Sequence, residues 1–349
     1  MRFIGRWLRR ILIALLVLVV LLLAPVGYNE FACRGDGETL SYSPIIEDTA
    51  WHRAEGRTLM TYPEWHIVHA YDDYAAVIRT GDPHDFGFFR AIGGFWGSLC
   101  ALTQVSAEHG GFSGDIKPTI YVIGVSFSLE LALKAAYEET LGRLFATFRG
   151  GDRAPLDDLS ARQATDYAAF LQQVPWYRWD FSADAQALSQ SRTDVVRDRE
   201  RAFALGLEYR VKAAYAKAIA AAVASAGYDE LRLRMVVSGI DAEELAGLTG
   251  IEIVGQTESG LIIETPRYRE LTHLIVGMAD KGAQFTEIAG NDDIMLTAIS
   301  PKGEDHGALF AFDRQGYGDR RHLILLKVTE LADWLRRTDR PTLEHIHDY

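Results

Sequence analysis

Two histidines and an aspartate share one side of a predicted helix in the segment YPEWHIVHAYDDY, residues 62–74. At about 100° per residue, His66 and Asp73 are about 20° apart around the helix axis, and His69 lies about 60° from His66. Two imidazoles and a carboxylate are a common ligand set for zinc or ferrous iron, so this stripe predicts a metal site. The alternative is that all three are ordinary half-buried polar groups bonded to neighbouring helices, since zinc-binding helices usually present histidines four residues apart.

Glu130 is the one charged residue in the apolar stretch 122–133. A buried carboxylate in such surroundings has to be paired, protonated or bound to a metal. If its helix faces the helix of His66, Glu130 completes the metal site. The alternative is an i,i+4 charge ladder of Glu130, Lys134 and Glu138 along a solvated helix edge.

Four aromatic residues gather in seven positions at a predicted helix break: Trp176, Tyr177, Trp179 and Phe181. Aromatic clusters of this kind supply the anchor residues of binding surfaces, so this segment is a candidate surface for a partner or ligand. The alternative is that the rings close the end of the helical bundle. Arg178 and Asp180 within the segment argue against deep membrane insertion.

The other histidines are weaker candidates. His273 ends a Glu-x-x-His sequence, but a di-iron bundle needs this motif on two of its helices, and this copy stands outside the predicted bundle. His345 and His347 stand four and two residues before the C-terminus, where a frayed tail is expected. His84 and His109 stand beside Pro83 and Gly110 and are expected in solvated loops.

Several enzyme classes lose their main sequence support. The chain has no GxSxG, GxGxxG after a strand, GxxxxGK[ST], HExxH or CxxCH motif. Serine hydrolases, dinucleotide enzymes, P-loop ATPases, zincins and c-type cytochromes are therefore disfavoured.

The N-terminus reads as a membrane anchor. Four arginines in the first ten residues precede a run from Ile11 to Tyr28 without a charged side chain. Eighteen residues of helix are about 27 Å long, close to the hydrocarbon thickness of a bilayer. A cleaved signal peptide is the alternative, but the candidate site near Ala24 contains Pro25. The positive charge predicts an inner-membrane protein with residues 1–28 as cytoplasmic N-terminus and anchor, a juxtamembrane segment at 29–60, and the bulk of the chain in the periplasm.

The two cysteines, Cys33 and Cys100, are compatible with that compartment. A disulfide between them is permitted there. A buried, unpaired Cys100 is the alternative, since free cysteine behaves as a small hydrophobic residue. Neither cysteine belongs to a CxxC redox or metal motif.

Residues 61–227 are predicted to form a helical bundle with short connections. Thr61 and Glu64, with Pro63 in the first turn, have the pattern of a capping box. Gly93 and Gly97 are spaced for close approach of a neighbouring backbone. The expected helices are Thr61–Arg79, Phe88–Glu108, Pro118–Phe148, Leu156–Val174 and Ala183–Ala226.

Residues 228–349 change from helical periodicity to alternation and are predicted to form a ferredoxin-like βαββαβ domain with a C-terminal extension. The expected elements are the strand Leu231–Val237, the helix Asp241–Leu248, the strands Ile251–Val254 and Leu261–Glu264, the helix Pro266–Lys281, and the strand Asp293–Ile299. The extension adds a strand at His322–Leu326 and a helix at Thr329–Arg337. The predicted fold class is thus α+β: an N-terminal transmembrane anchor, a mainly α-helical bundle, then this domain.

Composition sets the outer limits on function. The chain has 349 residues, of which 48% are hydrophobic, and 36 basic against 48 acidic residues give a net charge of −12. An acidic body repels phosphate backbones, so nucleic acid is not an expected partner. The leading hypothesis is a membrane-anchored envelope protein that binds a protein partner or a ligand without catalysis. The alternatives are a zinc or iron protein using His66, His69, Asp73 and Glu130, and a lipid or quinone binder using the apolar helices.

Overall fold

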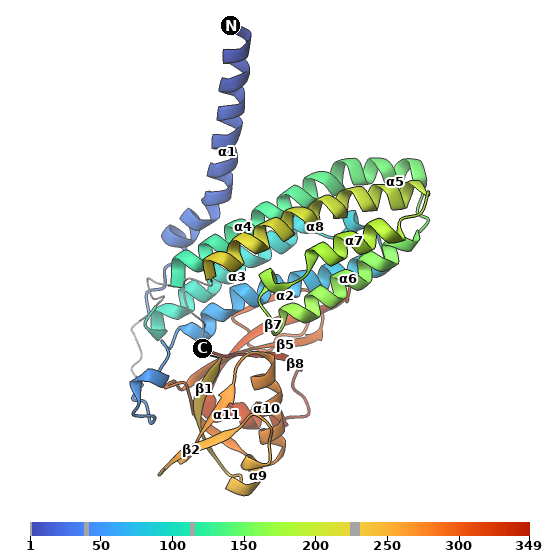
Figure 1. The fold of residues 1–349 in the computed structure, drawn as a ribbon. Helices are drawn as coiled ribbons and strands as arrows, with labels where there is room; N and C mark the ends of the chain where they lie inside the picture. The colour runs from blue at the N-terminus through green and yellow to red at the C-terminus, as the bar shows by residue number, and fades with distance from the viewer. Residues whose placement is uncertain (1, 38–41, 112–115, 224–230) are drawn as a thin grey trace.

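The computed structural model describes residues 2–37, 42–111, 116–223 and 231–349. Helices fill the N-terminal two thirds of the chain, and two four-stranded antiparallel sheets with three further helices follow (Figure 1). The predicted mixture of helix and sheet, preceded by an apolar helix, is therefore confirmed. The predicted boundary at residues 227 and 228 lies outside the described residues.

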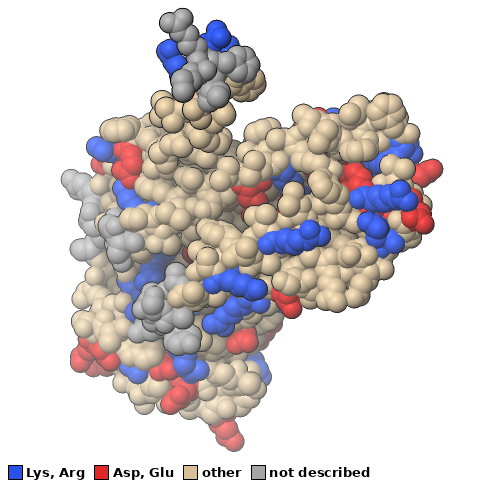
Figure 2. Space-filling model, turned by 45° about the horizontal axis from the view of Figure 1, so that its top comes forward, with Lys and Arg blue, Asp and Glu red and all other residues tan. Residues whose placement is uncertain are grey.

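Helix α1 (Arg2–Ala32) extends away from the rest of the chain. The described side chains from Ile11 to Tyr28 include no charged group, so the stem of α1 is uncharged in Figure 2, with basic side chains near its free end. Among the described residues, two helices are long and apolar enough to cross a membrane, at Arg6–Ala32 and Ile116–Arg149. The apolar part of the first is 0% buried, whereas 33% of the second is buried within the protein.

Seven helices follow α1 and lie along one another. They are α2 (Arg57–Thr80), α3 (Phe88–Ser106), α4 (Ile116–Tyr137), α5 (Arg143–Arg149), α6 (Pro155–Leu171), α7 (Phe181–Ser191) and α8 (Val196–Val223). A π-helical turn at Glu138–Gly142 joins α4 to α5, where one continuous helix was predicted. The predicted helix Ala183–Ala226 is two helices, because the chain breaks between Ser191 and Val196, and its last predicted residues lie outside the described part of the chain.

The start of α2 differs from the prediction. The helix begins one turn before Thr61, with Gly56 as its N-cap residue, and Thr61 donates its hydroxyl to the carbonyl of Thr58 at 2.9 Å. The capping-box interpretation of Thr61 and Glu64 is therefore wrong. The end of α2 at Gly81 agrees with the prediction.

The first sheet contains β1 (Arg232–Ser238), β2 (Glu252–Thr257), β3 (Gly260–Pro266) and β4 (Gln284–Ile288), in the spatial order β2-β3-β1-β4 with every pair antiparallel. Helix α9 (Ala242–Ala246) connects β1 to β2, and α10 (Arg269–Asp280) connects β3 to β4. The last strand was predicted at Asp293–Ile299, which is wrong. The fourth strand of this sheet, β4, was not predicted because Glu287 interrupts its apolar pattern. The carboxylate of Glu287 is fully buried and accepts hydrogen bonds from Tyr42 and from the backbone of Ile46.

The second sheet has the order β6-β7-β5-β8. Its strands are β5 (Asp293–Pro301), β6 (Phe310–Asp313), β7 (Asp319–Lys327) and β8 (Thr342–His347), and α11 (Val328–Arg336) joins β7 to β8. The predicted strand Asp293–Ile299 is therefore the centre of this sheet, paired on both sides. Strand β8 was not predicted.

The second sheet contributes to two of the three hydrophobic cores. Ile294 and Leu296 of β5 pack with the first sheet, α10 and α11, whereas Met295 packs with α2, α3 and α4. Side chains of β5 alternate between its two faces, so this one strand packs against the first sheet on one side and against the helices on the other. The third core lies among α6, α7 and α8.

Cys33 and Cys100 form a disulfide that joins the end of α1 to α3. Two α3 glycines make room for neighbours: an added Cβ on Gly94 would lie 2.8 Å from the His66 ring, and one on Gly97 would lie 3.3 Å from Phe310. Gly93 has open space around it. The close approaches at α3 are therefore to side chains, not to a second helix backbone at Gly93 and Gly97.

Candidate functional site

A line of polar side chains, here called the polar seam, runs between α2 and the second sheet. On α2 they recur every three or four residues, the spacing that places side chains on one side of a helix. All are buried except Glu344, which is half-buried. The polar seam consists of Tyr62, His66, His69 and Asp73 of α2, Arg321 of β7, and Glu344, His345 and His347 of β8.

Three of the four predicted metal ligands belong to the polar seam, each with a different partner. Nε2 of His66 lies 2.9 Å from the carbonyl of Ala91, and burial lowers the pKa of His66 to about 4. Asp73 accepts a hydrogen bond of 2.9 Å from the Gln315 backbone, and burial raises the pKa of Asp73 to about 7. His69 faces Glu344 instead.

The fourth predicted ligand, Glu130, lies elsewhere. Its carboxylate is 2.7 Å from Nζ of Lys212 on α8 and accepts a hydrogen bond from Tyr71 of α2. Lys134 pairs with Glu208 at 3.2 Å, so these charges bridge helices rather than forming a ladder along α4. The structure therefore does not bring Glu130 to the three α2 residues.

Arg321 and Glu344 form a bidentate ion pair at the centre of the polar seam. The guanidinium of Arg321 is fully buried and donates to both carboxylate oxygens of Glu344, with Nη2 at 2.6 Å from Oε1. Nε2 of His69 is 3.5 Å from Oε2 of the same carboxylate. Burial, and secondarily the nearby Arg321 charge, lower the pKa of His69, so this imidazole is neutral at pH 7.

The C-terminal histidines lie in strand β8, so the expectation of a frayed tail is wrong. The ring of His345 stacks on Trp65 with centroids 3.5 Å apart, and its Nδ1 is 3.1 Å from Oγ1 of Thr272. Burial lowers the pKa of His347 to about 3, and no described residue forms a hydrogen bond with either of its ring nitrogens. Thr272 also accepts from the Ile346 backbone at 3.0 Å, which closes the free edge of β8.

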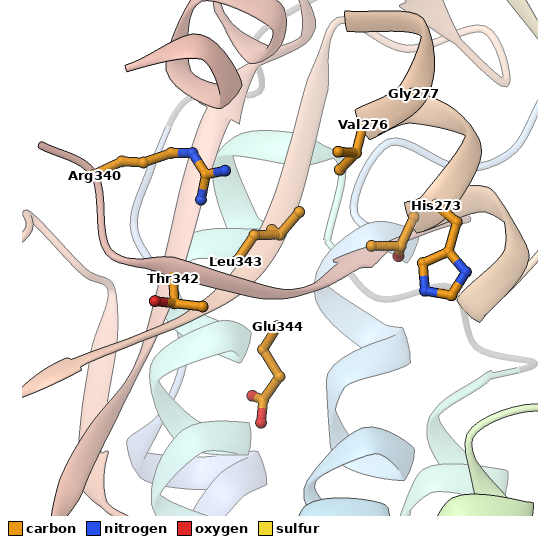
Figure 3. A pocket seen from close by; sticks show the side chains of 8 residues that line it. His273, Val276, Gly277, Arg340, Thr342, Leu343 and Glu344 are labelled. Atoms are coloured by element: carbon orange, nitrogen blue, oxygen red, sulfur yellow. The ribbon is translucent and has the colours of Figure 1, made fainter. Parts of the chain in front are cut away.

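A surface pocket opens beside the polar seam, between α10 and β8. Its volume is about 430 Å³, and it is lined by Thr272, His273, Val276, Gly277, Arg340, Thr342, Leu343 and Glu344. Figure 3 shows Arg340 and His273 at opposite ends, with Leu343 and Val276 between them and Glu344 pointing from β8 away from both. The pocket thus has a guanidinium and an imidazole at its two ends and an apolar centre, which suits a small polar organic molecule.

A second cluster surrounds His109, which is buried and not in a solvated loop as expected. Its Nδ1 lies 3.1 Å from Oε1 of Glu55 and 3.3 Å from Oδ2 of Asp293. The hydrogen bond to Asp293 raises the pKa of His109. Burial alone would raise the pKa of Asp293, but hydrogen bonds from His109 and Lys327 lower it. Among the described residues, this is the one group of three whose donor atoms lie close enough to share a metal ion.

The predicted aromatic surface packs into the third core. Phe181 is buried, and the other three rings are half-buried. Trp179 lies 5.5 Å from the Tyr167 ring and donates its indole N–H to Asp184 at 2.6 Å, while Trp176 lies 5.2 Å from the Tyr215 ring. The rings close this end of the helices, and their role as a partner surface stays a prediction.

Sequence reasoning missed Arg321, Glu344 and Glu55. The sequence does contain a signal for Arg321, because this arginine opens the apolar segment RHLILL. An arginine in that position is either buried at the start of a strand or exposed at the edge of a sheet. Nothing in the sequence links Glu344 to His69 or Glu55 to His109, because the members of each pair are far apart in the chain.

No family of proteins, no curated protein and no solved structure shows a significant match to this chain. Function therefore has to be inferred from the residues and their surroundings.

Proposed function

We propose that this chain is a single-pass protein of the cell envelope, with α1 in the inner membrane, the N-terminus in the cytoplasm, and a periplasmic body that binds a partner or ligand without catalysis. Helix α1 carries the proposal. Its apolar part makes no buried contact with the rest of the protein, and arginines precede it. Positive charge is retained on the cytoplasmic side, which gives the orientation.

The disulfide between Cys33 and Cys100 supports this location. Disulfides persist in the periplasm and are rare in the cytoplasm. The bond begins one residue after the end of α1, so it also fixes the body directly beside the membrane surface.

Reporter fusions at the C-terminus test the orientation. A fused alkaline phosphatase, which folds only where its own disulfides form, should be active, and a fused green fluorescent protein exported by the same route should be dark. A fluorescent, phosphatase-negative pair of fusions would overturn the proposed location.

We propose that the ligand occupies the pocket between α10 and β8. Arg340 and His273 supply a guanidinium and an imidazole at its two ends. Glu344, which also lines it, directs its carboxylate away from them to Arg321 and His69. A small polar organic molecule fits this lining better than a lipid tail, because polar groups lie at both ends of the apolar centre.

Purification of the full chain in mild detergent, followed by native mass spectrometry, tests the binding. Gly277→Trp should remove a bound small molecule, since Gly277 lines the pocket and an added Cβ there meets no atom within 4 Å. Gly93→Trp is the matched control, a helical glycine with the same open surroundings on α3. Recovery of the wild-type chain alone, monomeric and without ligand, would count against binding, and a lipid or quinone retained by both variants would place the ligand elsewhere.

We also propose the ferredoxin-like classification for the first sheet and the bundle classification for the helices. The element order β1-α9-β2-β3-α10-β4 and the spatial order β2-β3-β1-β4 support the first. The packing of α2 on α3, α4 and α6 supports the second. An experimental structure with a parallel neighbour for β1, or with α6 detached from α2, would contradict them.

Metal binding is a second candidate function, favoured by Glu55, His109 and Asp293. Two ligands about 2.0–2.1 Å from a tetrahedral zinc ion lie about 3.3 Å apart, close to the distances from His109 to both carboxylates. The hydroxyl of Tyr349 is buried without a hydrogen bond to any described residue. Burial, and secondarily the charges of Asp293 and Glu55, raise the pKa of Tyr349. Lys327 would compete with a metal ion for Asp293, because its ammonium group already pairs with that carboxylate at 2.9 Å.

Elemental analysis of the full chain, purified without chelator or affinity metal, separates the two predicted metal sites. Near-stoichiometric zinc or iron that is lost in His109→Ala would support the triad. Loss in His66→Ala or His69→Ala would instead support the α2 stripe. A metal-free wild-type chain would refute both.

A further inference from the structure

Large apolar side chains are exposed along two neighbouring helices of the body. On the α4–α5 segment they are Val122, Leu133, Leu144 and Phe148, and on α8 they are Phe203, Leu207 and Val211. Phe148 is 81% exposed and Phe203 66% exposed. These seven residues are here called the outer face.

The two halves of the outer face lie on the same side of one helical layer. Helices α4 and α8 run side by side and antiparallel, because Glu130 meets Lys212 while Lys134 meets Glu208. The sides opposite to the outer face are buried: Phe127 and Leu131 of α4 enter the second core, and Leu205 and Tyr209 of α8 enter the third. Both exposed stripes therefore point away from the cores.

Helix α1 leaves the body on this same side. Its last turns contact the start of α4, where Glu30 accepts from Tyr121 at 2.6 Å and from Lys117 at 3.1 Å. In Figure 1, α4 and α5 form the edge of the body from which α1 rises, with α1 near the start of α4 and α5 at the far end. In Figure 2 much of the upper edge of the body is uncharged, with a few acidic and basic groups at the base of α1.

We propose that the outer face rests in the headgroup and upper acyl region of the membrane that α1 crosses. This inference rests on the proposed membrane insertion of α1. An uncharged stripe flanked by basic residues is typical of helices that lie in the membrane plane, and the exposed charged side chains of α8 are all basic: Arg199, Arg210 and Lys217. The α4–α5 segment lies on the membrane rather than crossing it, because its inner side is covered by protein and by the buried lysine pairs.

Lipid fits this surface better than a protein partner does. The outer face follows the α4–α5 segment and α8, and its position beside α1 brings it to the bilayer without any partner.

Spin labels on the full chain in nanodiscs test the proposal. Cys33 and Cys100 are paired and no described cysteine is free, so a third cysteine is the one that reacts. Labels would be placed at Leu207 in the outer face, at Leu16 in α1, and at Ala169, an exposed position on α6, as control. The accessibility of each label to oxygen and to a water-soluble nickel complex reports its depth.

The label at Leu207 should show an oxygen-to-nickel accessibility ratio several-fold above that of the label at Ala169. The double substitution Phe148→Glu and Phe203→Glu should lower the ratio at Leu207 and leave the ratio at Leu16 unchanged. Equal, aqueous values at Leu207 and Ala169 with a deep Leu16 would overturn the inference and leave the anchor intact. Shielding of Leu207 from both reagents would identify a protein interface and also overturn it. An aqueous Leu16 would refute the proposed function itself.

Discussion

Replacing His66 by glutamine should reduce the loss of stability between pH 7 and pH 5. Burial lowers the pKa of His66 from 6.5 to about 4, although the carbonyl of Ala91 partly opposes this. Between these two pH values the unfolded chain binds a proton that the folded chain does not. The stability contributed by neutral His66 is therefore complete above pH 6.5 and is lost as the pH falls toward 4.

The size of the effect follows from the two pKa values. At pH 5 the unfolded histidine is almost fully protonated and the folded one is mostly neutral, which lowers the free energy of unfolding by about 2 kcal/mol relative to neutral pH. Glutamine does not titrate, and its amide can donate to Ala91 in place of Nε2. The difference between wild-type and variant stability should therefore shift by about 2 kcal/mol in favour of the variant on going from pH 7 to pH 5.

Urea unfolding of the full chain in detergent, followed by tryptophan fluorescence at pH 7, 6 and 5, measures this difference. Asp73 acts in the opposite direction, because burial raises its pKa to about 7 and its protonation stabilises the fold as the pH falls. Its contribution cancels, since wild type and variant both contain it. His273→Gln, at an exposed position, is the control and should follow the wild type. Parallel wild-type and His66→Gln curves would refute the neutral, buried state of His66.

Three further changes test the packing. Cys100→Ser should destabilise the oxidised protein by about 4 kcal/mol, because the bond to Cys33 closes a loop with a sequence separation of 67, and the wild type under reducing conditions should match the variant. Arg201→Met removes the cationic partner of the buried Glu138 and one of the two arginines paired with Glu200, and it should cost about 3–5 kcal/mol in unfolding experiments. Arg199→Met on the exposed side should leave the midpoint unchanged. Gly124→Ala should cost about 1–3 kcal/mol, since its Cβ would lie 2.3 Å from a phenylalanine ring of α3, and an unchanged thermal midpoint would contradict that packing.

Elements with a regular apolar pattern were predictable from the sequence. Helix α3 and strands β1 and β3 lie close to their predicted positions, because most of their buried residues are apolar and recur at the period of the element. Strands β4 and β8 were missed for one shared reason. Glu287, His345 and His347 are buried in them, and the groups that make this burial tolerable come from distant parts of the chain.

The α2 half of the candidate site was predictable and the sheet half was not. Helical spacing alone places His66, His69 and Asp73 on one buried side. Their chemistry depends on what faces them, and the facing groups, Arg321 and Glu344, lie about 250 residues or more further along the chain. Spacing cannot reveal such a partner, because it reports only which residues share a face of one element.

The two proposed surfaces constrain each other. The outer face and α1 lie on one side of the helices, whereas the pocket lies beyond the second sheet, between α10 and β8 (Figure 1). A body resting on the bilayer through α4, α5 and α8 would therefore keep the pocket open to the aqueous side. A ligand would reach Arg340 and His273 from water without crossing lipid, which favours a water-soluble molecule over a quinone or lipid taken from the membrane. The arrangement also requires that filling the pocket through Gly277→Trp leave the membrane depth of Leu207 unchanged.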